Sequence, residues 1–267
     1  MAHLFYQEQA KAVVELLRKI SLNGALYVSV PPDQSEAVRR LLQNVFPGNE
    51  IVVRGVQNRG YDIAPFICDF SDRYADYDLV LKLHTKKSSH VPWLKGWGDY
   101  LLGNMAGSSE TVSAILKMFA EDKKLGLVYP EIIPPLKEEL KKDQWQENWD
   151  ICRDLSSRLG LSIRREMMAD FPAGSMFWFR PKALEPLFKL GLASEDFPEG
   201  MSIRRNGTLA HAVERLLVLI AEKQGFAGRA IRFEPFRKIR DMSFGGRLHD
   251  RAFCEWNRFL DFAGFKR

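Results

Sequence analysis

The sequence has few cysteines, no long apolar run and no secretion signal. Its three cysteines, Cys68, Cys152 and Cys254, lie far apart and form neither a CxxC pair nor a disulfide framework. Nowhere does the chain approach the roughly 18 uninterrupted apolar residues of a transmembrane helix. The first residues, Met1–Tyr6, lack the charged and apolar regions of a signal peptide. We therefore expect a cytoplasmic protein with unpaired cysteines that are buried or incidental.

Positive charge is concentrated at the C-terminal end. The net charge of the chain is +5, and residues 227–267 account for all of it, with ten Lys or Arg against five Asp or Glu. The same stretch holds seven of the 18 Phe, together with Trp256. Such a segment is typical of contact with an anionic membrane surface, and it also fits a helical subdomain with a solvated basic face. No nucleic-acid motif accompanies the charge, so we expect no nucleic-acid partner.

The first half of the chain alternates short apolar runs with helical patterns. Strands are predicted over 4–6, 25–30, 51–56 and 78–83, and helices between them over 7–20, 33–46 and 62–74. This alternation is typical of a doubly wound, mostly parallel α/β sheet flanked by helices. Further strands are predicted over 125–130 and 175–180, and an apolar helix over 208–223.

The strand predicted over 78–83 ends in the polar run His84–Ser88. Ligands of open α/β sheets bind outside the carboxyl ends of the strands, and lysine, imidazole and hydroxyl groups suit a phosphate-bearing ligand. Lys82 alternates with apolar residues inside the strand and needs either a partner or a ligand there. No paired carboxylates stand at this strand end to hold Mg²⁺ or Mn²⁺, so we expect no metal. The alternative for the lysines is a solvated surface pair.

Two turns of small residues are further candidates. In the first, Asn58–Asp62, Gly60 permits a left-handed backbone, and Asp62 either caps a helix or reaches a sugar hydroxyl. In the second, Gly174 and Ser175 precede an aromatic strand and allow a ligand to approach the backbone closely. An ordinary turn with an N-cap is the alternative for the first, and for the second the aromatic residues Phe177 and Trp178 are more often core than stacking surfaces for a ligand.

The helix that starts near Thr208 carries charged residues in an apolar context. His211 and Glu214 are three residues apart and share one face, where they could act as an acid–base unit or anchor a neighbouring loop. A buried structural network of Glu214 with Arg215 is the alternative. Other candidate carboxylates precede this helix, namely Glu195, Asp196 and Glu199.

These features form four ordered blocks that resemble the rhamnan synthesis protein F family of bacterial polysaccharide-assembly proteins. The blocks are Asn58–Phe66, Leu81–Ser88, Phe171–Arg180 and Gly207–Arg215, and the resemblance covers roughly residues 3 to 226. It implies a GT-A-like (Rossmann-like) glycosyltransferase domain over 1–226. From composition we expect residues 227–267 to be a helical or irregular basic aromatic segment, a candidate for docking on the inner face of the plasma membrane.

The resemblance also implies substrates and roles. The protein would transfer a sugar, with L-rhamnose from dTDP-L-rhamnose as the candidate, to a lipid-linked glycan of the cell wall or O-antigen. His84-Thr85-Lys86 occupies the place of the metal-binding Asp-x-Asp motif of many GT-A enzymes, which implies a metal-independent enzyme without a cofactor. The implied substrate-binding residues are Asn58, Arg59, Gly60, Asp62, Lys82, His84, Thr85, Lys86, Lys87, Ser88, Gly174, Ser175 and Arg215. The implied catalytic residues are Glu214, His211 and Asp196.

One residue departs from the family pattern. The family favours Asp before Gly-Thr-Leu, whereas this chain has Asn206, and an amide cannot act as a general base. Either the base is another carboxylate, or the chain is a non-catalytic nucleotide- or glycan-binding module of an assembly complex.

Overall fold

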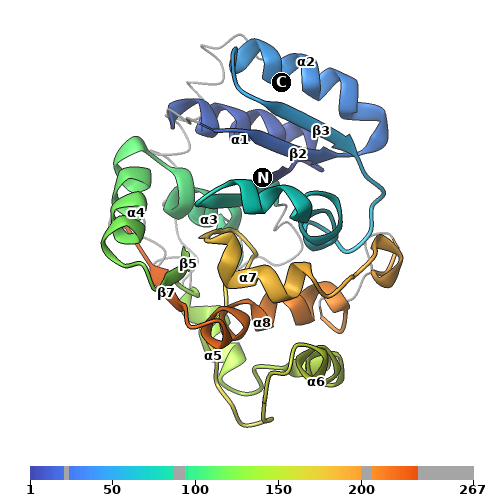
Figure 1. The fold of residues 1–267 in the computed structure, drawn as a ribbon, viewed down its shortest axis with the longest axis vertical. Helices are drawn as coiled ribbons and strands as arrows, with labels where there is room; N and C mark the ends of the chain where they lie inside the picture. Colours follow the sequence, from blue (N-terminus) through green and yellow to red (C-terminus); the bar gives the residue numbers. More distant parts are fainter. Residues whose placement is uncertain (21–23, 87–93, 95, 200–205, 234–267) are drawn as a thin grey trace. The chain divides into compact units, whose positions relative to one another are not determined.

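A seven-stranded sheet organises the chain in the order β3-β2-β1-β4-β6-β5-β7 (Figure 1). The computed structural model describes residues 1–20, 24–86, 94, 96–199 and 206–233. The strands are β1 (Ala2–His3), β2 (Leu26–Val30), β3 (Ile51–Gly55), β4 (Val80–His84), β5 (Leu125–Pro130), β6 (Phe177–Phe179) and β7 (Ala227–Ile231).

The sheet is mixed but mostly parallel. Strands β1 to β4 pair with one another in parallel, and β5 pairs in parallel with β7. Strand β6 runs antiparallel to both of its neighbours, β4 and β5. This arrangement confirms the predicted fold class, since a mostly parallel sheet with one reversed inner strand is consistent with a GT-A-like, Rossmann-like fold. Reversal of β6 brings its first residues to the edge where the parallel strands end.

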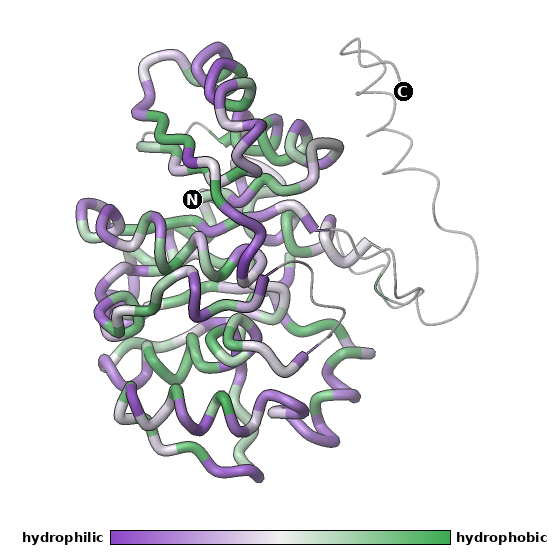
Figure 2. The backbone as a smooth tube through the Cα atoms, turned by 90° about the vertical axis from the view of Figure 1, so that its right-hand side faces the viewer, coloured by the Kyte–Doolittle hydropathy of each residue, from purple (hydrophilic) through white to green (hydrophobic). Residues whose placement is uncertain are grey.

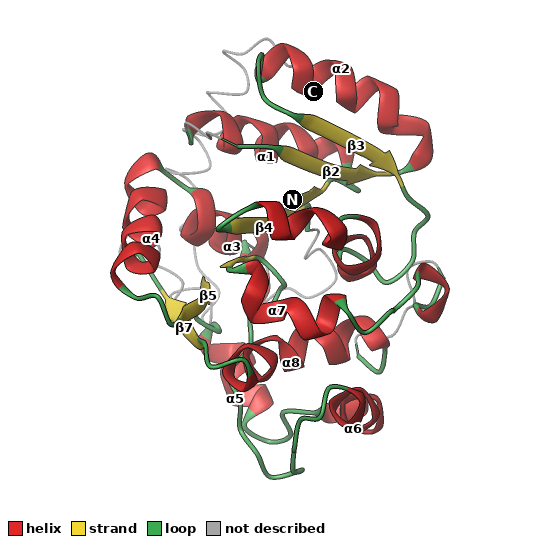
Figure 3. Ribbon diagram, in the orientation of Figure 1, coloured by secondary structure: helices red, strands yellow, loops and turns green. Residues whose placement is uncertain are grey.

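Helices flank the sheet (Figure 3). They are α1 (Gln7–Lys19), α2 (Ser35–Val45), α3 (Trp97–Ala106), α4 (Ser109–Glu121), α5 (Pro134–Leu140), α6 (Trp149–Arg158), α7 (Pro181–Phe188) and α8 (Leu209–Lys223). Successive side chains of a strand point to opposite faces, and β6 shows this clearly. Trp178 donates its indole N–H to Met105 of α3, while Phe177 and Phe179 pack into the core that α7 and α8 help to form.

The largest core cluster centres on aromatic rings. Phe66 is fully buried and lies edge-to-face against Phe177, Phe179 and Phe188, with ring centroids 5.5 to 5.8 Å apart. Tyr74 packs on the same ring and donates its hydroxyl to the Phe66 carbonyl. These contacts tie the connection between β3 and β4 to β6 and α7, and so they fix the layer beneath the polar groups described below.

Three elements differ from the sequence prediction. The first strand, predicted over 4–6, lies at Ala2–His3. The helix predicted over 62–74 is a π-helix, Pro65–Asp69, followed by a 3₁₀ helix, Ser71–Asp76. The compact unit extends to Phe233, because residues 227–231 form β7 and complete the sheet. The sequence instead placed them in the C-terminal segment, since their exposed edge position leaves only Ile231 buried and gives no apolar alternation. Residues 234–267 of that segment lie outside the described residues.

Hydrophobic and hydrophilic residues alternate at short intervals along the backbone (Figure 2). In the part of the chain that the structure describes, no helix is both long enough and apolar enough to span a bilayer.

The aromatic cluster predicts where stability is most sensitive. Phe66→Ala should lower the free energy of unfolding by about 3–5 kcal/mol, because it removes a buried ring and leaves a cavity. Leu116→Ala is the matched control, since Leu116 is 41% exposed, and it should cost no more than about 0.5 kcal/mol. Urea unfolding measures both values, and equal losses in the two variants would contradict the packing described.

Candidate functional site

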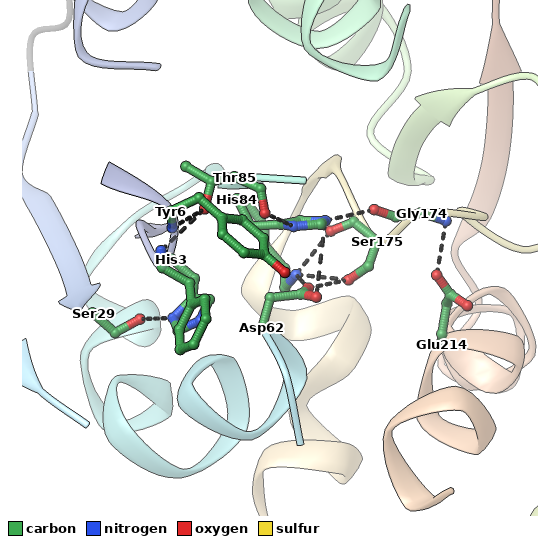
Figure 4. Close-up of polar contacts among 11 residues, drawn as sticks. His3, Tyr6, Ser29, Asp62, His84, Thr85, Gly174, Ser175 and Glu214 are labelled. Carbon is green, nitrogen blue, oxygen red and sulfur yellow. Dashed lines mark hydrogen bonds and ion pairs between the residues drawn. The ribbon is translucent and has the colours of Figure 1, made fainter. Parts of the chain in front are cut away.

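The centre of the polar cluster is a lysine inside the sheet. Lys82 of β4 has 0% exposure, and its ammonium donates to the Asp62 carboxylate, to the Ser175 carbonyl at 2.8 Å and to the Ser175 hydroxyl at 2.7 Å. Ser175 donates its hydroxyl to Asp62 at 2.6 Å and so closes a triangle of hydrogen bonds; Figure 4 shows Asp62 and Ser175 side by side. The buried cation is therefore fully partnered within the protein, as a lysine in a buried strand must be.

Charge and hydrogen bonding keep this pair ionised. Burial alone would raise the pKa of the Asp62 carboxyl, but nearby His84 and Lys82, and the hydrogen bonds from Lys82 and Ser175, hold it well below its usual range. Burial lowers the pKa of Lys82 from its usual value, and the charge of Asp62 opposes that shift. The pair thus behaves as a buried ion pair with added hydrogen bonds, the form in which such pairs are tolerated.

Two left-handed turns carry the partners of Lys82. Gly60 and Tyr61 have φ of 58° and 57°, and Gly174 and Ser175 have φ of 88° and 60°. A side chain other than glycine is strained in this region, by about 1–3 kcal/mol. Tyr61 and Ser175 both bear that strain, and each directly adjoins the ion pair in sequence or in space. Lys82 and Asp62 therefore supply the interactions that hold the two turns in place.

His84 continues the network at the end of β4. Its Nε2 lies 2.8 Å from the Gly174 carbonyl, and its Nδ1 lies 3.0 Å from the Thr85 carbonyl. Burial lowers the pKa of His84 to about 4, so the ring is neutral at pH 7. The hydroxyl of Thr85 accepts the backbone N–H groups of Phe5 and Tyr6, both at 3.0 Å, which ties this strand end to the chain after β1.

Glu214 of α8 meets the same turn from the other side. Its Oε1 accepts the backbone N–H of Gly174 at 2.8 Å (Figure 4). Burial raises the pKa of Glu214, and the positive charges of Arg215 and Lys86 only partly oppose the shift. A half-buried carboxyl with a raised pKa accepts a proton more readily than an ordinary carboxyl does.

His211, one turn earlier on α8, is held by local contacts. Its Nδ1 lies 2.7 Å from the Thr208 hydroxyl, and its ring packs edge-on against Tyr61 at 5.6 Å. Burial, followed by the charges of Arg215 and Lys86, lowers the pKa of His211 to about 4. It therefore carries no charge at pH 7, and it connects the Tyr61 turn to the helix that bears Glu214.

Arg215 and Asn206 belong to a separate hydrogen-bond network, called here the Arg215 network. The guanidinium donates to the carbonyls of Gln144 and His211 and to the amide oxygens of Gln146 and Asn206, at 3.0 to 3.3 Å. Asn206 in turn donates its amide to Gln146. These bonds fix the segment before α6 and the segment before α8 to the helix itself. Asn206 therefore has a positioning role, and the buried network expected as the alternative for Arg215 is present without a direct bond to Glu214.

The remaining predicted residues lie around this centre. Arg59 donates to the Phe197 carbonyl at 3.2 Å and pairs with Glu199 at 3.3 Å, and Asn58 is half-buried beside it. A Cβ at Gly60 would meet the ring of Phe197 at 2.5 Å, so only glycine allows this close packing.

Asp196, predicted as a catalytic acid, is exposed and accepts the backbone N–H of Ala193. Within the described residues no hydrogen bond joins it to Glu214 or to the cluster around Lys82. Lys87 and Ser88 lie outside the described residues.

Sequence reasoning missed two aromatic residues of the site. Tyr61 adjoins His211, and Trp97, the first residue of α3, lies beneath the ammonium of Lys86, which is 4.3 Å from its ring centroid. In the sequence, the only signal for Tyr61 was that it follows Gly60. The only signal for Trp97 was that it is an aromatic residue soon after the lysine run. Within the described residues, no group of three or more His, Cys, Asp or Glu side chains could hold a metal ion.

The family model described as rhamnan synthesis protein F matches residues 1–226 of the chain. The chain belongs to this family. The match includes every residue of the Lys82–Asp62–Ser175 triangle, together with Glu214 and the Arg215 network. The family's name links the chain to rhamnan synthesis and thus to polysaccharide synthesis.

Two curated relatives come from Xanthomonas campestris pathovar campestris, strains B100 and ATCC 33913, and each is called uncharacterized protein WxcX. Both are 37% identical to the chain over 181 residues, which is 67% of this chain and 25% of each relative. The chain thus spans about a quarter of the relatives' length. No solved structure matches the chain.

The buried ion pair of this family member predicts a double-mutant result. Lys82→Met should lower the free energy of unfolding by about 3–5 kcal/mol, because the Asp62 carboxylate is left buried without its cation. Adding Asp62→Asn should restore part of that loss, because the uncompensated charge is gone. Urea unfolding at pH 7 measures the cycle, with the exposed Lys117→Met as control. Losses that simply add would contradict the coupling.

The buried histidines predict acid sensitivity. Burial lowers the pKa of His3 to about 4, while Asp62 partly opposes and His84 and Lys82 reinforce the shift. The unfolded chain binds this proton near pH 6.5 and the folded chain does not, so the contribution to stability is complete above about pH 6.5 and is lost as the pH falls toward 4. Carboxyls with raised pKa, such as Glu214, change in the opposite sense, so a comparison of variants is needed.

His3→Asn isolates the effect, because the amide can still bond to the Ser29 hydroxyl, 2.9 Å from His3 Nδ1. When the pH is lowered from 7 to 5, the melting temperature of the variant should fall by less than that of the parent protein. Parallel curves for the two proteins would show that His3 is not buried in its neutral form.

Proposed function

We propose that the chain is a glycosyltransferase domain that moves a sugar from a nucleoside diphosphate donor to a growing cell-surface polysaccharide. The candidate donor is dTDP-L-rhamnose, and the candidate acceptor is a lipid-linked glycan of the cell wall or O-antigen. One observation carries the proposal. On a GT-A-like sheet, the carboxyl end of β4 presents histidine and lysine where related enzymes present metal-binding carboxylates.

The proposed roles follow the geometry. The turn that contains Asn58, Arg59 and Asp62 would lie beside the nucleoside and sugar, and basic groups after β4 would face the diphosphate. The Gly174 turn would lie on the acceptor side, because Glu214 approaches it from α8. Lys82 would act through Asp62 and Ser175, since its ammonium has no exposed surface.

In the proposed reaction the acceptor hydroxyl oxygen attacks the anomeric carbon of the donor sugar. Glu214 accepts the hydroxyl proton, and the bond between sugar and β-phosphate breaks with its electron pair on the departing oxygen. The nucleoside diphosphate leaves with added negative charge, which nearby cationic side chains neutralise in place of a metal ion. The raised pKa of Glu214 favours this role, because a more basic carboxylate accepts a proton more readily.

Membrane contact belongs to the same proposal. A lipid-linked acceptor would be reached at the inner face of the plasma membrane, and the basic aromatic segment after Phe233 has the composition to dock there. That segment lies outside the described residues, so its role is proposed from composition alone.

Transfer from radiolabelled dTDP-L-rhamnose to membrane-extracted glycan tests the function. Glu214→Gln should lower kcat by about 10²–10⁴-fold with little change in donor affinity, because the base is lost and the turn contact is kept. In the parent protein kcat should fall as the pH drops through a value above the usual carboxyl range.

Controls separate the alternatives. Glu222→Gln, an exposed change on the same helix, should leave kcat unchanged, and a loss in Asp196→Asn equal to that of Glu214→Gln would move the base away from α8. Transfer should persist in EDTA. Activity lost on chelation and regained with Mn²⁺ would contradict metal independence, and saturable donor binding without turnover would favour the binding-module alternative.

A further inference from the structure

The cations of the candidate site are not equally available to a ligand. Lys82 is fully hydrogen-bonded to Asp62 and Ser175. His84 is buried and neutral at pH 7, so its single ring N–H donates to one of the two carbonyl oxygens beside it, and the ring offers a ligand no positive charge. Arg215 is buried, and its donors are taken by carbonyl and amide oxygens. A buried, fully bonded group can contact a ligand only by breaking bonds that are costly to lose.

Lys86 differs from these groups. It is half-buried, and its backbone is fixed because Gln9 donates to its carbonyl at 3.0 Å. Among the residues that the structure describes, no carboxylate lies within ion-pair distance of its ammonium. Its positive charge contributes to lowering the pKa of His211 and partly opposes the raised pKa of Glu214.

Trp97 explains how the ammonium is held without being neutralised. The Lys86 Nζ lies 4.3 Å from the centroid of the indole ring, within the range of a cation–π contact. The same indole packs against Gly174, where an added Cβ would meet Trp97 at 3.0 Å and Leu101 at 2.4 Å. The ring is thus wedged between the turn that binds Glu214 and the lysine. An aromatic face orients a cation but leaves its hydrogen-bond donors open to an anion.

We propose that Lys86 is the cation that binds the diphosphate of the donor, and that Trp97 is the residue that positions it. This inference rests on the proposed function for the identity of the ligand. It adds a positioning residue that none of the sequence motifs contains, and it removes Lys82 from the set of direct phosphate ligands. Trp97 touches both the Lys86 ammonium and Gly174, and the Gly174 N–H binds Glu214, so one aromatic side chain links the proposed phosphate contact to the turn that holds the proposed base.

Binding of inorganic pyrophosphate tests the inference, measured by calorimetry in EDTA at pH 7.5. Lys86→Ala should weaken binding by about tenfold or more, because a charge-assisted contact is lost. Trp97→Phe should stay within about twofold of the parent protein, because a phenyl face still accepts a cation. Trp97→Leu should lose most of what Lys86→Ala loses, because it fills space without an aromatic face. The exposed Lys117→Ala is the charge-matched control and should bind normally.

Comparing Trp97→Phe with Trp97→Leu separates positioning from packing, since a purely structural role predicts equal losses in both. Melting temperatures accompany each titration, and the Phe variant keeps the test valid if the Leu variant unfolds. Parent protein that fails to bind pyrophosphate, or a Lys86→Ala variant that binds it normally, would overturn the inference.

The two proposals can fail separately. Pyrophosphate binding that depends on Lys86 and Trp97, without transfer from any nucleotide sugar, supports this inference and contradicts the proposed enzyme. Sugar transfer whose donor KM is unchanged in Lys86→Ala supports the proposed enzyme and contradicts this inference.

Discussion

The candidate site depends on one buried charge pair. Lys82 and Asp62 satisfy each other inside the sheet, and the hydroxyl and carbonyl of Ser175 complete the lysine's hydrogen bonding. Exposing either charge alone to a low-dielectric interior would be costly, so the two turns that carry the partners must stay where the pair needs them. The strained backbone at Tyr61 and Ser175 persists because the interactions of this ion pair hold both turns in place.

Through Gly174, the same constraint reaches the residue proposed to move the proton. The Gly174 carbonyl faces His84, its N–H faces Glu214, and its Cα packs on Trp97. The separate Arg215 network fixes the start of α8, and the Asn206 amide takes part in it as both acceptor and donor. Asn206, where the resemblance leads us to expect an aspartate, is therefore compatible with a structural role at that position, and the carboxylate of Glu214 is held by a different set of bonds.

Local pattern was enough to predict most elements, because apolar periodicity is a property of neighbouring residues. Helix α8 and strands β2, β3 and β5 lie where that pattern placed them. The sequence indicated that Lys82 needs either a partner or a ligand, and it placed Lys82 among the substrate-binding residues. Local pattern could not reveal the protein partners, because Asp62 is brought to Lys82 by a crossover and Ser175 by a reversed strand. Strand β7 was missed since an edge strand buries little apolar surface. The cation–π support at Trp97 depends on tertiary packing and has no spacing rule.

Reversal of β6 divides the loops of the molecule into two groups. Segments that end β1 and β4 and begin β6 meet at the edge where the polar cluster lies. Turns before β3 and β5 belong to the opposite edge, and Gly48 in the first of them has open space where a side chain would stand. Evolution or an engineer can therefore lengthen those distal turns, or insert a tag or a whole domain there, while the chemistry at the other edge is left untouched.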